Sequence, residues 1–455
     1  MGKLDKIYDS SPVFVQNLAV SLKGYSNNRE RYGRDYREYR RFLKEFDTWS
    51  LEKQLAYQQD ELVKFVRYAY ENSPFYREFY KDVDIQTIKT VDDLKKLPVL
   101  EKETLRQHIE GISTNPDEPL MHSNTGGTTG KSLTVAMTYR DMKFRMAMLD
   151  HFKAKVGFEH RKMRRATFNG KHIVPPSQKR KRFSRYNAAC KQRIYSSFHI
   201  TEENMKYYVE DLNRFKPHAI DGFFTSMCEI ASYIERHNMQ LTFTPKAIFP
   251  TSETLTDEGR ELLERVFHCK VYNQYASSEG APFVNDCIDQ HLHVELASGV
   301  FESLDDDSDE VLVTSFTTHA TPLIRYRIGD RMIFDHETKC SCGSSAPMVK
   351  CIMGRKLDFL FTAEGARINA GNVSNILKYL PNVVIRSQFV QDRKDEVVLL
   401  LEVDKNLYNK SCEHLIQQEF THKFGENTRL SIQYVDEIPR ETSGKLLMIK
   451  NNVKE

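Results

Sequence analysis

Apolar side chains recur at intervals of three and four along the first hundred residues, which is the period of a helix packed along one side. Residues 51–70 show this most clearly, with Leu, Val and aromatic residues at that spacing. Residues 25–46 interleave tyrosine with arginine. We interpret them as a helix whose tyrosines pack on the core, and contact with a membrane surface or an acidic partner is the alternative. This region is therefore predicted to be mostly helical.

Short apolar runs alternate with amphipathic segments from residue 134 to about residue 355. Leu255–Phe267 has the pattern of a helix, and Lys270–Tyr275, with its β-branched and aromatic residues, has that of a strand. Such alternation is typical of an α/β fold. The basic clusters Arg161–Arg165 and Lys179–Arg182 lie in this part. We interpret them as solvated loops, and contact with an anionic substrate is the alternative.

The pattern changes again after about residue 355. Strands are predicted at 359–362, 383–391, 396–403 and 429–435, and helices at 371–380 and 412–424, before a polar tail. This is a compact α+β unit. We therefore predict an α/β protein with a large N-terminal domain of several subdomains, residues 1–355, and a small α+β C-terminal domain, residues 356–455.

The chain has 455 residues, 40% of them hydrophobic, and a net charge of +3. This length predicts two or more domains, and the small net charge gives no reason to expect a nucleic-acid partner. No apolar signal segment follows the N-terminus, and no apolar run approaches the ~18–20 residues of a membrane span. We therefore expect a cytoplasmic protein. Eight cysteines over this length do not make a disulfide scaffold.

A glycine-rich stretch, Ser123–Ser132, is the most distinctive polar segment, with three glycines, three threonines and a lysine between residues 125 and 131. Glycine lets backbone approach a ligand, successive N–H groups can form an anion-binding nest, and the lysine adds a positive charge. We interpret the stretch as a polyphosphate-binding loop, and a polar surface turn is the alternative. A Walker A loop is disfavoured, because Thr125 stands where its first glycine belongs and no apolar run precedes the loop to form its strand.

The stretch resembles the Thr/Ser-Ser/Gly-Gly-Thr-Thr-Gly-Lys signature of the adenylate-forming enzymes, which include acyl-CoA synthetases, firefly luciferases and peptide-synthetase adenylation domains. Tyr68–Arg77 and Leu94–Lys102 resemble the N-terminal region of one branch of that family. This branch holds phenylacetate–CoA ligases and the related CapK-like proteins of capsular-polysaccharide gene clusters. The resemblance implies that the loop binds ATP through Thr125, Gly126, Gly127, Thr128, Thr129, Gly130 and Lys131.

Tyr275–Gly280 directly follows a predicted strand, where α/β proteins place their ligands. An aromatic ring can cover adenine, and a carboxylate can hold Mg²⁺, which prefers oxygen ligands. The segment resembles the family's Tyr-Gly-x-Ser/Thr-Glu motif, with Ala276 in place of glycine. The resemblance implies that Tyr275 lies against adenine, that Ser278 belongs to the nucleotide site and that Glu279 binds Mg²⁺ as a catalytic residue.

Pro322–Asp330 reads as an apolar strand that ends in a glycine turn and an aspartate, which can accept both ribose hydroxyls of a nucleotide. It resembles the family's Tyr-Arg-Thr-Gly-Asp motif with Ile328 in place of threonine, which implies Asp330 as the ribose ligand. Gly354–Leu360 resembles a motif whose arginine contacts ribose or phosphate. The resemblance implies that role for Arg355 and a hinge between the domains within residues 356–358.

Thr251–Glu253 resembles the family's Ser-Gly-Glu turn beside the adenine, which implies Ser252 and Glu253 as further nucleotide contacts. Ile438–Lys445 resembles the C-terminal Pro-Arg-x-x-x-Gly-Lys loop. A lysine there can reach the α-phosphate and the attacking carboxylate, where negative charge builds as pyrophosphate leaves. The resemblance therefore implies Lys445 as a catalytic residue.

Cys340 and Cys342 form a tight pair followed by glycine, with Cys287, His291 and His293 upstream. Three thiolates and one imidazole suit a closed tetrahedral zinc site, which leaves no position for a catalytic water. The phenylacetate–CoA ligase branch has a Cys…His…Cys-x-Cys-Gly pattern in this interval. It implies a structural Zn²⁺ held by Cys287, His293, Cys340 and Cys342. Cysteines without a metal, or Cys351 as a substitute ligand, are the alternatives.

Together the motifs imply two half-reactions at a site between the domains. A carboxylic acid and ATP give an acyl-adenylate and pyrophosphate, after which the mobile C-terminal domain rotates and a nucleophile, usually the thiol of CoA, displaces AMP. The implied cofactors are ATP, Mg²⁺, CoA and Zn²⁺, and a homodimer is a candidate assembly. The alternatives are adenylyl or acyl transfer in polysaccharide biosynthesis without CoA, and a non-catalytic nucleotide-binding scaffold. The acid pocket is expected to include Gly222–Ser226 and the stretch after Glu279.

Overall fold

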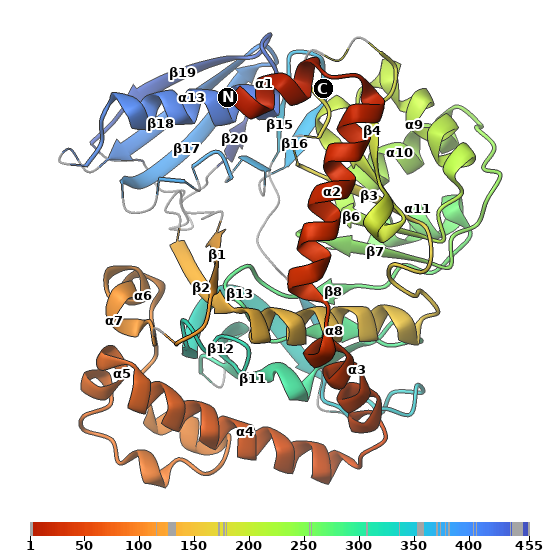
Figure 1. Cartoon of the computed structure of the whole chain (residues 1–455). Helices are drawn as coiled ribbons and strands as arrows, with labels where there is room; N and C mark the ends of the chain where they lie inside the picture. Colours follow the sequence, from red (N-terminus) through yellow and green to blue (C-terminus); the bar gives the residue numbers. More distant parts are fainter. Residues whose placement is uncertain are drawn as a thin grey trace.

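A computed structural model describes most of the chain, and every structural statement below refers to the described residues. These are residues 3–114, 116–125, 133–171, 173–175, 178, 180–253, 255, 257–305, 308–335, 337–352, 359–369, 372–373, 375–377, 379–380, 383–403, 405, 407–436, 438 and 449–453. Figure 1 shows a parallel sheet with its helices (green), a second, antiparallel sheet, a helical N-terminal region (red and orange) and a smaller C-terminal part (blue). Among the described helices, none combines the length and the apolar character needed to cross a bilayer.

The N-terminal region is helical, as predicted. In α3 the tyrosines face the protein: the Tyr36 hydroxyl donates to Asp150 at 2.9 Å, and the Tyr39 hydroxyl accepts from Arg140 at 3.0 Å. The interpretation of the Tyr/Arg stretch as a helix packed on the core therefore holds for α3, whereas Tyr25 lies in the preceding helix α2 and is exposed. The helices of the region are α1 (Lys3–Ser10), α2 (Val13–Arg31), α3 (Arg34–Phe46), α4 (Leu51–Asn72), α5 (Pro74–Phe79), α6 (Lys102–Gln107) and α7 (Ile109–Ile112), with the 3-10 turns η1 (Ile85–Thr87) and η2 (Asp92–Lys96).

A five-stranded sheet in the order β4-β5-β3-β6-β7 forms the α/β part, and only the edge strand β4 runs antiparallel. Its apolar residues pack under three helices, with Ile220 and Ile230 fully buried between them. The α/β prediction is therefore confirmed. The elements are β3 (Arg165–Asn169), β4 (Ser184–Asn187), β5 (Gln192–Ser196), β6 (Ala219–Phe223), β7 (Ala247–Thr251), η3 (Ala188–Cys190), η4 (Ser197–His199), α9 (Glu202–Phe215), α10 (Phe224–Arg236) and α11 (Asp257–Phe267).

The strand predicted at residues 270–275 is shorter than expected. Val271 makes a single parallel bridge to Ile248 of the first sheet, whereas β8 (Gln274–Tyr275) pairs antiparallel with β9 of the second sheet. Between them the Asn273 N–H donates to the Asp286 carboxylate at 2.7 Å. The segment therefore crosses from one sheet to the other, which brings Tyr275 to the junction of the two.

The second sheet holds seven antiparallel strands in the order β11-β12-β13-β14-β10-β9-β8. One apolar core joins it to α4, where Leu62 and Tyr326 are both fully buried. Its strands, besides β8, are β9 (Val284–Asp286), β10 (Leu292–Val294), β11 (Gly299–Ser303), β12 (Glu310–Ser315), β13 (Leu323–Asp335) and β14 (Met348–Ile352), with η5 (Leu296–Ser298) between β10 and β11 and the long helix α8 (Tyr139–Lys155) crossing nearby (Figure 1).

A separate hairpin precedes α8 and is formed by β1 (Leu120–Thr125) and β2 (Leu133–Thr138). The expectation that no strand precedes the glycine-rich loop is therefore wrong. β1 lacks an apolar run, but it pairs with β2 along its whole length, from Leu120 opposite Thr138 to Thr125 opposite Leu133. Backbone pairing holds this strand, and the alternating buried residues of β2 supply the apolar face.

The C-terminal part is a small α+β unit, as predicted. A four-stranded sheet in the order β19-β18-β17-β20 packs on α13, with Phe389, Leu399 and Phe420 fully buried between them. The polar tail also contributes: β20 pairs parallel with β17, with Ile449 opposite Phe389. The helix predicted at 371–380 lies partly outside the described residues. The elements are β15 (Phe359–Phe361), β16 (Arg367–Asn369), β17 (Val384–Arg393), β18 (Glu396–Val403), α13 (Lys410–Phe424), β19 (Arg429–Tyr434) and β20 (Ile449–Asn451).

Candidate active site

The glycine-rich loop connects the two strands of the β1–β2 hairpin, since β1 ends at Thr125 and β2 begins at Leu133. A strand–loop–strand order differs from the strand–loop–helix order of a Walker A motif. The topology and the residue Thr125 both indicate that the loop is not a Walker A motif. Eight of the predicted site residues lie outside the described residues: Gly126, Gly127, Thr128, Thr129, Gly130, Lys131, Arg355 and Lys445.

Tyr275 and Asp330, predicted to contact adenine and ribose, lie side by side. The Tyr275 hydroxyl donates to the Asp330 carboxylate at 2.8 Å. The sequence suggested that Asp330 stands at the end of a strand, but the residue lies inside β13. The first half of β13 pairs with β12 and its second half, from Met332, pairs with β14, so the strand continues through the glycine. Motifs more than fifty residues apart in the chain thus meet at one point.

Glu279 lies four residues after Tyr275 in the loop that follows β8, and only 9% of it is exposed. The ammonium group of Lys102, at the start of α6, lies 3.3 Å from one of its carboxylate oxygens. The neighbouring Ser278 is exposed. The ammonium group of Lys102 offsets the charge of this carboxylate, and the role of Glu279 as a Mg²⁺ ligand stays a prediction.

Arg145 of α8 fixes the loop that carries Glu279, and the sequence analysis did not identify it. Its guanidinium donates to the carbonyl oxygens of Gly280 and Ala281, both at 2.9 Å, and to the Thr317 hydroxyl at 3.0 Å. Burial lowers the pKa of Arg145 to about 10. Gly280 has φ +108°, and a Cβ there would come within 2.5 Å of the Thr318 methyl carbon. The loop is therefore closely packed from both sides.

The turn at Ser252 and Glu253 directly follows β7. Ser252 has φ +68°, the left-handed conformation that favours glycine. This is the position at which the resembling Ser-Gly-Glu turn has its glycine. The side chain of Gln274 donates to the Pro250 carbonyl at 3.2 Å, which ties the end of β7 to β8 and thus to Tyr275.

A contact between Glu229 and Arg367 links the N-terminal part to the C-terminal part. Glu229 of α10 lies 3.8 Å from Arg367 of β16. Burial raises the pKa of Glu229 to about 8, while Arg367 opposes the rise and the charge of Glu253 adds to it. The predicted acid-pocket segment at 222–226 lies at the start of the same helix, where β6 passes into α10.

A cavity of about 300 Å³ also lies between the two parts. Residues of η4 and the loop after β3 form one side, and the end of α13 with the turn at Glu364 forms the other. The charged and polar lining residues are Gln178, Lys181, His199, Thr201, Asn204, Glu364, His422, Lys423, Glu426 and Asn427.

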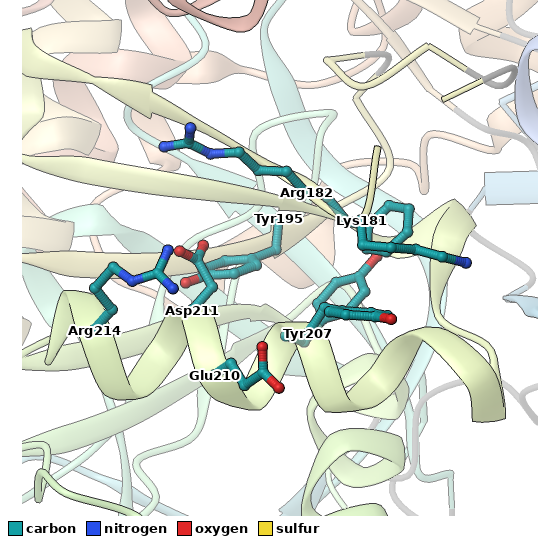
Figure 2. Close-up of a pocket in the computed structure, with 9 residues that line it drawn as sticks. Lys181, Arg182, Tyr195, Tyr207, Glu210, Asp211 and Arg214 are labelled. Carbon is teal, nitrogen blue, oxygen red and sulfur yellow. The ribbon is translucent and has the colours of Figure 1, made fainter. Parts of the chain in front are cut away.

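A smaller cavity of about 120 Å³ adjoins it and shares Lys181 and Phe183 with it. Figure 2 shows Arg182 and Arg214 on the side of this cavity away from Lys181, with Asp211 beside Arg214. Part of the basic segment 179–182 lines these cavities, but Arg180, Lys181 and Arg182 are all exposed, which agrees with the interpretation as a solvated loop. The other basic cluster is not wholly a solvated loop, because Arg165 at its end is mostly buried and pairs with Asp221 at 2.9 Å.

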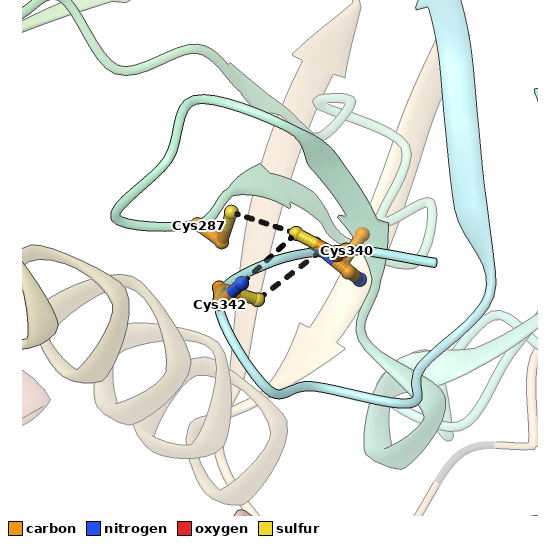
Figure 3. A group of neighbouring side chains, drawn as sticks. Cys287, Cys340 and Cys342 are labelled. Atoms are coloured by element: carbon orange, nitrogen blue, oxygen red, sulfur yellow. Dashed lines mark hydrogen bonds between the residues drawn. The ribbon is translucent and has the colours of Figure 1, made fainter. Parts of the chain in front are cut away.

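The three predicted cysteine ligands come from two loops and lie together, as Figure 3 shows. The sulfur atoms of Cys287 and Cys340 are 3.6 Å apart, and the Cys342 sulfur is 3.7 Å from Nε2 of His293. The four ligand atoms all lie within 4.8 Å of one another. Ligands at about 2.3 Å from a tetrahedral ion would be about 3.7 Å apart, so the set fits zinc.

His293 is also oriented for this role, because its other ring nitrogen, Nδ1, lies 3.0 Å from the Ala346 carbonyl oxygen. Such a contact turns Nε2 toward a metal. His291 approaches only Cys340, with its Nδ1 3.2 Å from that sulfur. Cys351, the substitute considered from the sequence, lies in β14 and is not part of the group.

Comparison with known proteins gives three findings. The profile of the CapK C-terminal domain matches residues 360–452. Protein CapK of Staphylococcus aureus is 37% identical over 455 residues, which cover 99% of this chain and 100% of that protein. This chain belongs to the CapK-like branch of the adenylate-forming enzymes. The phenylacetate–coenzyme A ligase of Thermus thermophilus is 25% identical over 451 residues, 88% of this chain and 97% of that enzyme.

Solved structures carry the same fold as this CapK-like chain. A 2-hydroxyisobutyryl-CoA ligase in complex with 2-HIB-AMP and CoA, in the thioesterification state, superposes with a TM-score of 0.60 at 15% identity. The match covers 90% of this chain and 92% of that one. The predicted fold class and the predicted family are both confirmed. The roles of individual site residues stay predictions.

Proposed function

We propose that this CapK-like enzyme activates a carboxylic acid with ATP as an acyl-adenylate and then transfers the acyl group to CoA. The observation that carries the proposal is the hydrogen bond between Tyr275 and Asp330, which joins two motifs that are separate in the sequence. Glu279 belongs to the same motif as Tyr275 and follows it in the loop after β8. The relatives named above as CoA ligases support the chemistry.

In the first half-reaction the substrate carboxylate attacks the α-phosphate of ATP and pyrophosphate leaves. Tyr275 would lie against adenine, Asp330 would accept the ribose hydroxyls, and the glycine-rich loop would hold the phosphates. The attacking and attacked groups are both negative, so the reaction needs positive charge at the site. Lys445 would supply it at the α-phosphate. Glu279 would hold Mg²⁺, which when bound neutralises phosphate oxygens.

The second half-reaction requires the acceptor to reach the adenylate between the domains. We propose a domain boundary at residues 355 and 356, close to where the C-terminal profile and the C-terminal core begin, with a C-terminal domain that rotates between the two steps. The cavity between the two parts carries Lys181 and Lys423, whose ammonium groups suit the phosphates of CoA, together with the carboxylates of Glu364 and Glu426. It would hold the acceptor during transfer.

We also propose a structural Zn²⁺ at Cys287, His293, Cys340 and Cys342. Bound there it would join the loop before β10 to the connection between β13 and β14. Four protein ligands leave no position for water, so the ion would stabilise the second sheet and take no part in the reaction.

The first experiment measures pyrophosphate release with Mg-ATP across aryl, fatty, hydroxy and amino acids, each with and without CoA. Release with one class of acid, accelerated by CoA, supports the proposal and names the substrate. Pyrophosphate release at a rate that CoA does not change favours adenylyl or acyl transfer to another acceptor, such as a sugar of polysaccharide assembly. ATP binding without release for any acid favours a non-catalytic scaffold.

Lys445→Ala tests the catalytic assignment. Loss of a cation aimed at developing charge typically costs about 10²–10³-fold in rate. We expect a fall of that size in acid-dependent pyrophosphate release, with an unchanged melting temperature. Lys450→Ala, five residues later in the exposed part of β20, is the matched control and should keep full activity. A fully active Lys445→Ala variant would remove Lys445 from the mechanism.

A further inference from the structure

Helix α2 presents its apolar side to solvent. Phe14 is 72% exposed, Leu18 57%, Leu22 60% and Tyr25 58%. Spacings of four, four and three residues place them on one side of the helix, and we call these four residues the α2 stripe. Nine large apolar side chains are exposed in the described chain, and five of them lie between Ile7 and Tyr25. This surface is therefore concentrated at one place, which marks it as a contact surface.

The side of α2 that faces the protein is mostly polar, although Val20 packs against the core of the first sheet. The Asn17 side chain accepts a hydrogen bond from the Tyr186 N–H at 2.9 Å, and the Asn28 side chain donates to the Ala189 carbonyl at 3.0 Å. Between them the Ser21 hydroxyl accepts from the Ala188 N–H at 3.0 Å. These contacts join α2 to β4 and η3 over nearly the whole length of the helix.

Two further contacts prevent α2 from rolling to bury its stripe. Gly24 lies so close to the sheet that a Cβ there would come within 2.2 Å of the Asn187 side chain. The Gln16 side-chain oxygen accepts from the buried guanidinium of Arg185 at 2.5 Å. A rolled helix would leave this arginine and several backbone groups without these partners, which is costly. The outward position of the stripe is thus a property of the fold.

We propose that the α2 stripe binds the α2 stripe of a second copy of this chain, with the two helices antiparallel about a twofold axis. The axis would pass between Leu18 and Leu22, so that Leu18 packs on Leu22 of the other copy. Phe14 would then pack on Tyr25 of the other copy. Two helices can pack in this way at about 8–10 Å between their axes. Such an interface is isologous and closes after two copies.

The charges around the stripe favour this occupant. Arg29 lies on the stripe side one turn after Tyr25. Antiparallel helices keep the Arg29 residues of the two copies at opposite ends of the interface, whereas parallel helices would bring Arg29 to Arg29. An anionic lipid surface would call for a uniformly basic border. Here the described charges of α1 and α2 have both signs.

The exposed area fits the centre of a modest dimer interface. Side chains of this size have on the order of 150–200 Å² each, so these exposed fractions leave roughly 400 Å² of apolar surface per copy. A stable interface takes about 800 Å² from each partner. The stripe thus provides about half, and the polar residues beside it on α1 and α2 provide the rim. We expect a dimer that dissociates at roughly micromolar concentrations.

Sedimentation equilibrium of the full chain over roughly 1–100 µM tests the proposal. Wild-type protein should shift from monomer to dimer in this range. Leu18→Glu with Leu22→Glu brings like charges together across the axis and should raise the dissociation constant at least ~100-fold. Leu407→Glu changes a side chain that is 51% exposed on the C-terminal part, and this control should still dimerise. Activity should be unchanged in both variants, and so should the melting temperature at concentrations where wild-type protein is monomeric, because the altered side chains are exposed.

A mixture of Phe14→Cys and Tyr25→Cys chains tests the direction of the helices. Antiparallel pairing yields disulfides between the two variants, whereas parallel pairing yields disulfides within each variant. A wild-type monomer at all concentrations would overturn the proposal, as would a dimer that survives the double glutamate substitution. Binding of the monomer to phosphatidylglycerol vesicles, lost in the double variant, would assign the stripe to a membrane instead. The inference does not depend on the proposed function.

Discussion

Replacing Arg145 with methionine should both destabilise the enzyme and slow its chemistry. The change removes charge-assisted hydrogen bonds to the Gly280 and Ala281 carbonyls, worth about 1.5–3 kcal/mol each. The Gly280 carbonyl keeps a donor, the Ser315 hydroxyl at 2.5 Å. Burial of the guanidinium lowers the pKa of Arg145 to about 10, and this cost of burying the charge offsets the hydrogen-bond energy by about 3 kcal/mol. We therefore expect a net loss of about 2 kcal/mol in the free energy of unfolding.

The functional consequence arises at Glu279, which the clamped loop holds in place. A displacement of about 1 Å at a reacting centre can cost roughly 10²-fold in rate. Pyrophosphate release, measured well below the melting temperature, should fall by about that factor. The Mg²⁺ concentration for half-maximal rate should rise, since the proposed metal carboxylate is no longer positioned. Arg145→Lys keeps the charge but loses the planar fork, and its activity should lie between the two.

Scanning calorimetry and the Mg²⁺ dependence of the rate check the two parts separately. A loss of about 2 kcal/mol should lower the melting temperature by roughly 2–3 °C in a domain of this size. An unchanged melting temperature would refute the energetic reasoning. A folded Arg145→Met variant with wild-type rate and wild-type Mg²⁺ dependence would show that Arg145 does not position Glu279.

Three further predictions follow from the geometry. Cys342→Ser should lose bound zinc in elemental analysis and lower the melting temperature, whereas Cys351→Ser, outside the cluster, should keep the metal; equal zinc in both would contradict the ligand set. Tyr275→Phe removes the hydrogen bond to Asp330, so the KM for ATP should rise up to about 10-fold, as expected for one hydrogen bond, with little change in kcat; an unchanged KM in steady-state kinetics would argue against the pair. The pKa of Glu229 is about 8 in the folded chain against 4.5 ordinarily, so the folded chain holds this proton more tightly. Its contribution to stability is complete below about pH 4.5 and is lost as the pH rises toward 8, with a slope of up to ~1.4 kcal/mol per pH unit. Denaturant titrations of Glu229→Gln should lack this slope, and a slope identical to wild type would assign it to other groups.

Local sequence patterns were sufficient for most of the elements. The strand at 396–403 has the predicted bounds, and the predicted helix that ends at Phe424 begins two residues earlier than expected. Both were predictable because the spacing of their apolar residues marks one buried face. β1 and β20 were missed for the opposite reason. Each is held by pairing with a strand elsewhere in the chain, and nothing in their own residues marks an apolar face.

The residues of the candidate site also differ in whether the sequence could identify them. Tyr275, Glu279, Asp330 and the zinc ligands stand in short motifs, so residue order was enough to propose them. Arg145 carries no such signal, since a single arginine in an amphipathic helix looks like a surface residue until the fold buries it against the Gly280 carbonyl.

The sequence by itself determined the family, the alternation of strands and helices and the residue types of the chemistry, because these depend on neighbours along the chain. Only the tertiary structure decided which distant residues meet. It joined Tyr275 to Asp330, and it brought His293, which the resemblance had already favoured, together with the three cysteines. It also turned the apolar side of α2 outward, because the polar residues of that helix found their partners in β4 and η3. Contacts between segments far apart in sequence depend on packing and backbone pairing, which no local pattern records.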